Sequence, residues 1–337
     1  MWRTKRGKPS TMRRINFAPL SRSVSAIGFG CASLGSRVDA KRGRAALARA
    51  YDAGISWFDV APSYGDGRGE FLLGDFLAGK RSEIAVCTKV GLLPGHVSFP
   101  MRIAKPAVQS FNAFLPRLRK HIVKFRPTAR SVELTGSFIE SSIVESLRRL
   151  QTDYVDVLAL HEARLVDVER DDVLRALENV VSKGFARTIS LAGDLSVSLA
   201  ALSLSKHVSI IQVANNLFRP NVGLAKQQLP SGQSVSFVTH SVFGQDDLDR
   251  LNSMIAREAD KRSLLDAAGY RTATAEAAAA FLLDFALASN PDGVVLLSMY
   301  QPRHFSFNLG RLLSSPSPDV VLELASRLVD SSACAQP

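Results

Sequence analysis

The sequence predicts an α/β fold, a (β/α)8 TIM barrel with a long basic insertion after its third strand. Apolar, β-branched runs alternate with amphipathic helical runs along most of the 337 residues, a pattern typical of parallel α/β folds. Eight strand–helix units fit a chain of this length. No G-x-G-x-x-G pattern follows the first strand, which argues against the alternative, a doubly wound open sheet.

The predicted strands are short apolar runs bounded by turn or helix signals. They lie at residues 24–30, 55–60, 84–90, 154–160, 186–192, 208–214, 234–240 and 293–298. Helices are predicted at 41–54, 69–79, 137–150, 172–184, 195–206, 246–262, 273–289, 302–313 and 318–329. Gly54 and the Gly at 184 read as helix C-caps, and Ser137 with Glu140 predicts a capping box.

Charge divides the chain into regions. Residues 1–45 hold eleven Lys or Arg and one acid, and residues 92–132 hold eight and none. We therefore predict a basic N-terminal extension at 1–23 and a single barrel domain at 24–330, with the insertion at 92–136. A segment this long inside a compact domain is usually functional or disordered. We favour a flap over the barrel mouth rather than an element that binds a partner or a membrane surface.

Composition narrows the classes of function. No stretch approaches a charge-free membrane span, and the N-terminus lacks the apolar core of a secretory signal. Three scattered cysteines indicate a reducing compartment and no disulfide framework. We expect a cytoplasmic protein with no membrane partner, although the Arg-rich start also resembles an organelle transit peptide and Met12 is an alternative start. The basic segments lack interleaved aromatic residues, so we favour a solvated tail and loop over a nucleic-acid surface.

Four polar residues stand at or just beyond predicted strand ends. Asp59 ends the second strand, Tyr64 lies in the Gly-rich turn after it, Lys89 ends the third strand and His161 closes the fourth. Strand-end residues of a parallel barrel converge at one face. Taken singly, each has a structural explanation, such as a helix cap for Asp59 or a strand-end pair of His161 with Glu162. Lys89 is the hardest to explain this way, because a buried lysine needs a partner.

Together, these four residue types suit the reduction of a carbonyl by a hydride. A tyrosine hydroxyl, with a reference pKa of ~10, is a poor acid near neutrality unless a cation stabilises the phenolate. Lys89 would supply that cation and lower the pKa of Tyr64, and Asp59 would keep Lys89 charged. His161 would hydrogen-bond the substrate oxygen and orient it. The pattern therefore predicts a proton donor at the barrel mouth.

Six segments of the chain carry a resemblance to a known family. They are SAIGFGCASLG, WFDVAPSYGDGRGEFLLGDFL, CTKVG, IVESLRRLQTDYVDVLALH, GFARTISLAG and IIQVANN. They resemble the aldo-keto reductases, in particular the sugar-dehydrogenase-like branches of bacteria and plants, from about residue 24 to about 310. The resemblance implies a (β/α)8 barrel that binds NADPH, or alternatively NADH. It also implies an Asp–Tyr–Lys–His tetrad at Asp59, Tyr64, Lys89 and His161, with Tyr64 as the general acid.

The resemblance further implies cofactor contacts. Gln212 matches a residue that contacts the nicotinamide amide, and His240 replaces an aromatic side chain that stacks on the nicotinamide. After the last predicted strand, Ser298 and Asn308 are in register with cofactor-binding positions of the family. His304 lies where an arginine often binds the 2′-phosphate.

The chain also departs from the family pattern. We expect that neighbouring Arg303 could substitute for the arginine of the 2′-phosphate site. Ala192 and Gly193 replace a Ser-Asn pair, and Phe307 replaces an acidic residue. No metal site is expected.

We therefore predict an NAD(P)H-dependent oxidoreductase of carbohydrate metabolism that interconverts a small aldehyde, ketone or sugar with an alcohol. The alternative is a non-catalytic, cofactor-binding regulatory or sensor protein of the same fold, which the changed cofactor positions favour and the tetrad opposes. A partner-binding or RNA-binding scaffold ranks third. Because residues 92–132 carry eight cations beside the predicted site, we also hypothesise that the substrate is anionic, such as a sugar phosphate or an acidic sugar. The sequence does not determine the oligomeric state.

Overall fold

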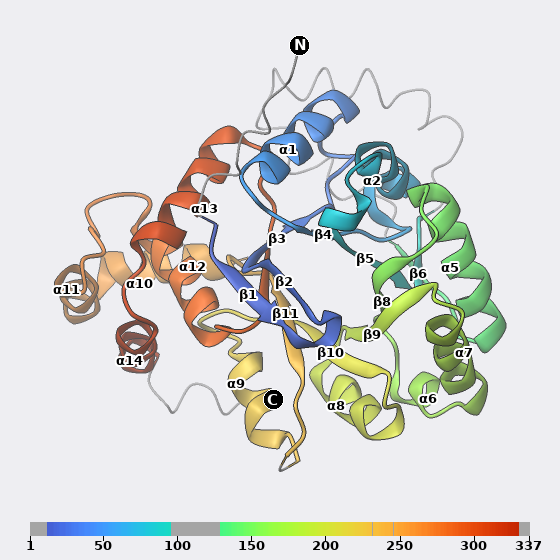
Figure 1. The fold of residues 1–337 in the computed structure, drawn as a ribbon. Helices are drawn as coiled ribbons and strands as arrows, with labels where there is room; N and C mark the ends of the chain where they lie inside the picture. Colours follow the sequence, from blue (N-terminus) through green and yellow to red (C-terminus); the bar gives the residue numbers. More distant parts are fainter. Residues whose placement is uncertain (1–11, 96–128, 231, 245, 330–337) are drawn as a thin grey trace.

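The computed structural model describes residues 12–95, 129–230, 232–244 and 246–329. Parallel strands close into a barrel that helices surround (Figure 1), which confirms the predicted fold class. The strands follow one another around the barrel in chain order, and the last pairs with the first. They are β3 (Ile27–Gly30), β4 (Trp57–Asp59), β5 (Ala85–Val90), β8 (Val155–His161), β9 (Ala186–Ala192), β10 (Val208–Ala214), β11 (Ser236–His240) and β12 (Val294–Leu297).

Several outer helices bury an apolar stripe against the strands. In α7, for example, Val173, Ala176, Leu177 and Val180 are buried at helical spacing. The α-helices are α1 (Ala40–Asp52), α2 (Gly69–Leu77), α5 (Gly136–Leu150), α6 (Leu165–Val168), α7 (Asp171–Ser182), α8 (Leu195–Leu204), α9 (Asn221–Gln228), α10 (Asp247–Arg257), α11 (Ala259–Ala267), α12 (Ala277–Ser289), α13 (Pro302–Ser314) and α14 (Pro318–Leu328). Of these, α10, α11 and α14 pack in a separate cluster with α12. Three 3-10 turns also occur, η1 (Ala18–Leu20), η2 (Tyr64–Gly67) and η3 (Arg81–Glu83).

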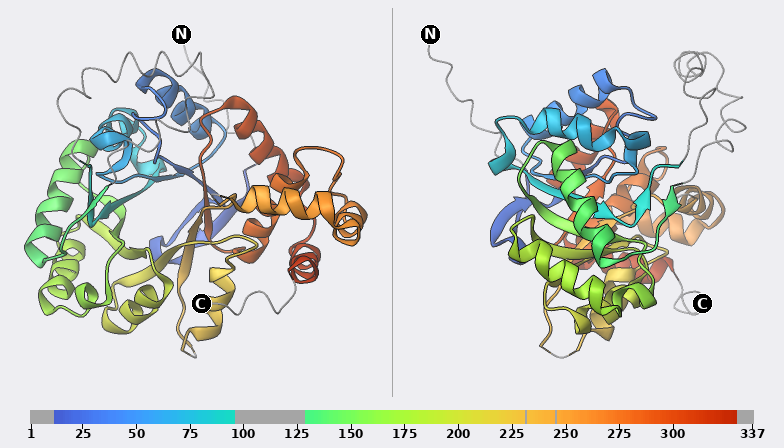
Figure 2. Two further views of the ribbon diagram at one scale, coloured as in Figure 1. Left: turned by 180° about the vertical axis from the view of Figure 1, so that it is seen from behind. Right: turned by 90° about the vertical axis from the view of Figure 1, so that its right-hand side faces the viewer.

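A β-hairpin occupies the described chain on both sides of residue 23, where the sequence predicts the boundary between the extension and the barrel. Strand β1 (Arg14–Phe17) pairs antiparallel with β2 (Arg22–Ser25), and this hairpin lies across one end of the barrel (Figures 1 and 2). Phe17 is buried there, with its ring centroid 5.1 Å from that of Trp57. Residues 24 and 25 therefore belong to the hairpin, and the barrel strand begins at Ile27.

The ends of the predicted insertion at 92–136 also pair with each other. Strand β6 (Leu92–Leu93) runs antiparallel to β7 (Arg130–Ser131), at the end of the barrel opposite the hairpin (Figure 2). Residues 96–128, on which the prediction of a basic flap rests, lie outside the described residues. In the described ranges, no helix is long and apolar enough to cross a membrane.

Several helix predictions need correction. The predicted capping box at Ser137 and Glu140 does not form. The N-cap of α5 is Thr135, whose side chain accepts a hydrogen bond from the Phe138 N–H. The Glu140 carboxylate instead accepts hydrogen bonds from Asn179 and Lys183. The predicted helix 246–262 is divided, because the backbone is extended at the residue between α10 and α11. The short helices α6 and α9 were not predicted.

Candidate active site

Alternation along the strands brings the functional side chains to the barrel mouth. Side chains that point into a barrel recur at every second residue. Ala85 and Cys87 of β5 and Trp57 of β4 lie in the inner core, so Lys89 and Asp59, two residues further on, face the mouth. Four other strands have the inner-core residues Ala159, Ile210, Val238 and Leu296. Two residues beyond each of them, at the cavity, lie His161, Gln212, His240 and Ser298.

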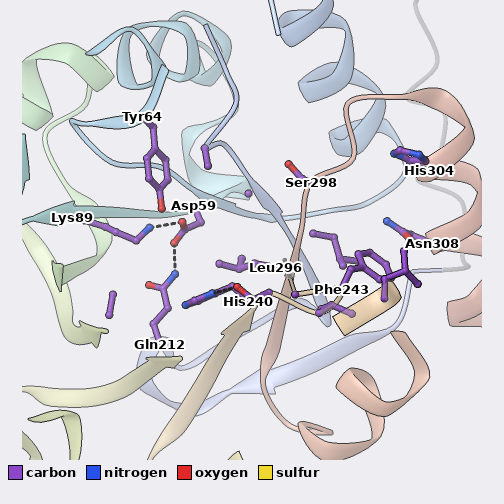
Figure 3. A pocket seen from close by; sticks show the side chains of 18 of the residues that line it. Asp59, Tyr64, Lys89, Gln212, His240, Phe243, Leu296, Ser298, His304 and Asn308 are labelled. Atoms are coloured by element: carbon purple, nitrogen blue, oxygen red, sulfur yellow. Dashed lines mark hydrogen bonds and ion pairs between the residues drawn. The ribbon is translucent and has the colours of Figure 1, made fainter. Parts of the chain in front are cut away.

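A buried ion pair forms the centre of the site. The Lys89 and Asp59 side chains are 2% and 3% exposed, and Lys89 Nζ donates to Asp59 Oδ1 (Figure 3). Gln212 Nε2 donates to the other carboxylate oxygen at 2.9 Å. Burial is the largest single effect and lowers the pKa of Lys89, but the acidic groups around it, Asp59 first and then Tyr64 and Cys87, together outweigh burial, so the pKa of Lys89 is raised above its ordinary value. Lys89 therefore remains a cation.

Tyr64 reaches this pair from the turn between β4 and α2. Its hydroxyl points toward Asp59 and Lys89 (Figure 3), and Lys89 Nζ is 4.9 Å from the Tyr64 ring centroid. The turn requires a glycine after Tyr64: Gly65 has a φ of +63°, and a Cβ there would lie 1.8 Å from the Leu34 carbonyl oxygen. Burial raises the pKa of Tyr64, and Lys89 only partly opposes this rise. Lys89 therefore lowers the pKa of Tyr64, as predicted, but burial is the larger effect and Tyr64 is protonated.

His161 stands beside Tyr64, with ring centroids 6.1 Å apart in an edge-to-face arrangement. Burial lowers the pKa of His161 to about 3, helped by the nearby Lys89 and His240. The ring is therefore neutral at physiological pH. Within the described part of the chain, its buried Nδ1 has no hydrogen-bond partner. The site thus places an unused polar atom close to the tyrosine.

These four residues lie at one end of a cavity of about 570 Å³, a size typical of small-molecule sites. The cavity extends past His240 toward Ser298, His304 and Asn308 (Figure 3). Burial lowers the pKa of His240 to about 4, and its Nδ1 lies 2.9 Å from the Ser241 hydroxyl. The predicted site residues other than Arg303 therefore line one cavity.

Arg303 is the exception. It is exposed, and its Nε donates to the Gln301 side chain at 3.0 Å. On α13 the cavity is lined by His304, Phe307 and Asn308, an i, i+3, i+4 set on one helix face. Arg303 lies outside that set, which is why it does not line the cavity.

Some residues that line the cavity were not predicted from the sequence. The segment after β11 contributes Val242, Phe243 and Leu248, and no motif marked it. Glu162 also lines the cavity, and its position directly after His161 was its one sequence signal. Among the described residues, no group of three or more His, Cys, Asp or Glu is placed to hold a metal ion.

The structure is thus a closed parallel barrel. Its mouth holds a tyrosine, a neutral histidine and a buried Lys–Asp pair, a set of side chains that suits an enzyme that transfers protons. The model of the Aldo/keto reductase family matches residues 26–310, and this chain belongs to that family. The resemblance drawn from the sequence motifs is thereby confirmed.

The similarity to individual relatives covers less of the chain than the match to the family model does. The chain is 31% identical over 230 residues to D-threo-aldose 1-dehydrogenase of a Pseudomonas species, over 66% of each chain. It is 30% identical over 178 residues to L-galactose dehydrogenase of Arabidopsis thaliana, over 50% of this chain and 45% of that one. The chain thus spans two thirds or less of the length of these curated relatives.

Solved structures share the fold. An aldo-keto reductase from Klebsiella pneumoniae, in complex with NADP and acetate, superposes with a TM-score of 0.64. The superposition covers 94% of this chain and 95% of that one, at 20% sequence identity. At this identity, the likeness concerns the fold alone.

Proposed function

We propose that the protein is an NAD(P)H-dependent oxidoreductase that interconverts a small aldehyde, ketone or sugar with the corresponding alcohol. The observation that carries this proposal is the Tyr64 hydroxyl, which lines the cavity beside a buried, charged lysine. Relatives named as sugar dehydrogenases and a structural neighbour bound to NADP support it. A role in carbohydrate metabolism and a cytoplasmic location belong to the same proposal.

The residues would act as follows. Tyr64 is protonated and donates its proton to the substrate oxygen as charge develops there. The phenolate that remains is stabilised by Lys89, which Asp59 keeps charged and in place. His161, neutral at the working pH, hydrogen-bonds the same oxygen and orients the carbonyl. In the reverse direction, the Tyr64 phenolate accepts the proton of the alcohol.

The cavity lining offers polar groups suited to a nicotinamide cofactor, which would supply or accept the hydride when bound. Gln212 Nε2 is engaged by Asp59, so Gln212 Oε1 is the atom that would meet the carboxamide. The flat, neutral ring of His240 would lie against the nicotinamide. Ser298, His304 and the buried Asn308 would hold the far end. We propose NADPH as the cofactor, with NADH as its competitor at the same residues.

The test is Tyr64→Phe, which removes one oxygen atom and keeps the ring. We expect turnover of an aromatic aldehyde to fall by about 10²–10⁴-fold, with the NADPH dissociation constant nearly unchanged. Tyr154→Phe is the matched control, because that ring stacks under Arg81, with its centroid 3.9 Å from the guanidinium carbon, and does not line the cavity. Wild-type rates in Tyr64→Phe would refute the role of the tyrosine. Binding of NADPH without turnover across a broad carbonyl and sugar panel would favour a non-catalytic sensor.

A further inference from the structure

Glu162 has an unusual backbone for a residue with a side chain. It follows His161 at the end of β8, and its φ is +55°, in the left-handed region that residues other than glycine rarely adopt. Its N–H donates to the Ala192 carbonyl at 2.8 Å. Strained residues of this kind cluster at binding and catalytic sites, and Glu162 lines the cavity beside the tetrad.

A missing side chain on the neighbouring strand makes room for this carboxylate. A Cβ on Gly193 would lie 3.3 Å from Glu162 Oε2 and 3.2 Å from Glu162 Cα, which is tighter than most real contacts. Ala192, the preceding residue, is also small and lines the same cavity. The two positions where the family pattern has larger polar side chains therefore leave space that Glu162 borders.

The Glu162 carboxylate is not neutralised by its surroundings. In the described ranges of the chain, its side chain makes no hydrogen bond or ion pair, and the charge that most affects it is another acid, Asp194. Lys89 is engaged by Asp59, and burial keeps the rings of His161 and His240 uncharged. The described wall at the reacting end of the cavity is thus negative.

We propose that Glu162 determines substrate specificity by accepting hydrogen bonds from the hydroxyl groups of a neutral, polyhydroxylated carbonyl substrate, and that it disfavours anionic substrates. This inference rests on the proposed function. An ionised carboxylate is the strongest acceptor available for hydroxyl donors, and it repels a nearby phosphate or carboxylate. The inference opposes the anionic substrate hypothesised from residues 92–132, most of which lie outside the described residues.

Three aldehydes of similar size separate these possibilities. Glyceraldehyde is neutral and has two hydroxyl groups, glyceraldehyde 3-phosphate keeps one of them and carries a phosphate on the other, and propanal has neither hydroxyl nor phosphate. We would measure kcat/KM for each with NADPH at one ionic strength, in the wild type and in Glu162→Gln. The matched control is Glu169→Gln, because Glu169 is exposed and does not line the cavity.

We expect the wild type to prefer glyceraldehyde to both analogues. In Glu162→Gln, the preference for glyceraldehyde over propanal should fall by about 3- to 10-fold, because glutamine still accepts a hydrogen bond but without the charge that strengthens it. The preference for glyceraldehyde over its phosphate should fall as well, and Glu169→Gln should change neither ratio. Equal changes for all three aldehydes, or a wild type that prefers the phosphate, would overturn the inference while leaving the reductase intact. A wild type that reduces none of them would overturn the proposed function and this inference with it.

Discussion

Replacing Lys89 by methionine tests the centre of the site through stability as well as activity. Methionine nearly preserves the volume of the lysine side chain but removes its charge. The Asp59 carboxylate then remains buried, with Gln212 Nε2, 2.9 Å away, and the Cys87 thiol as neutral hydrogen-bond donors. Breaking a buried ion pair by removing one partner costs about 3–5 kcal/mol, because an uncompensated charge is left behind.

The loss of stability in Lys89→Met should depend on pH in a defined direction. Burial without Lys89 favours the protonated carboxyl of Asp59 over the carboxylate, so the folded variant holds this proton more tightly than the unfolded chain does. The free energy of unfolding of Lys89→Met, relative to the wild type, should therefore fall as the pH rises above about 4, where carboxyl groups titrate in unfolded chains. The loss should be smaller at pH 5 than at pH 8.

Urea unfolding of both proteins at these two pH values is the assay. The double variant Lys89→Met/Asp59→Leu should recover much of the stability, because neither charge remains, yet it should stay inactive. Arg148→Met is the control: it breaks an ion pair with Glu145 in which both side chains are more than half exposed, and such pairs contribute little. A deficit of less than about 1 kcal/mol in Lys89→Met, the same at both pH values, would refute the reasoning.

Two further predictions concern protonation and the far end of the barrel. The pKa values of His161 and His240, about 3 and about 4, lie below the ordinary 6.5, so below pH 6.5 the unfolded chain binds protons that the folded protein does not. Stability should fall as the pH drops from 6.5 to 4, and His240→Gln should flatten that slope in urea unfolding; an unchanged slope would contradict it. Asp156 is fully buried, with Arg81 at 2.8 Å and Arg22 at 3.6 Å, so Asp156→Asn should cost about 1.5–3 kcal/mol and leave kcat unchanged. Thermal unfolding that matches the wild type, or a lowered kcat, would count against this prediction.

The sequence was most informative where burial is continuous. Strands β9 and β10 have the predicted bounds, because their apolar runs are buried on both faces between inner core and helices. The first strand of the hairpin was missed because its apolar signal is two residues, Ile15 and Phe17, within a basic segment. Its burial depends on contact with Trp57, which is distant in sequence.

The site divides in a similar way. Strand ends and residue chemistry sufficed to predict that Lys89 and Asp59 meet, because alternation along a strand is a strict rule of geometry. The rest depends on three-dimensional details that a sequence does not display. The pKa of Tyr64 follows the balance between burial and Lys89, and the place of Glu162 follows one backbone angle.

The hairpin at the closed end of the barrel also has a consequence for folding. It is among the first described segments of the chain, yet its core includes Val294 and Leu296 of the last barrel strand. Its packing can therefore be completed only after the whole ring of strands has formed. Trp57, fully buried against Phe17, lies at that junction, so its fluorescence should follow the final step of assembly rather than the first. Strands β1 and β2, although they come first among the described strands, are then among the last to reach their native packing.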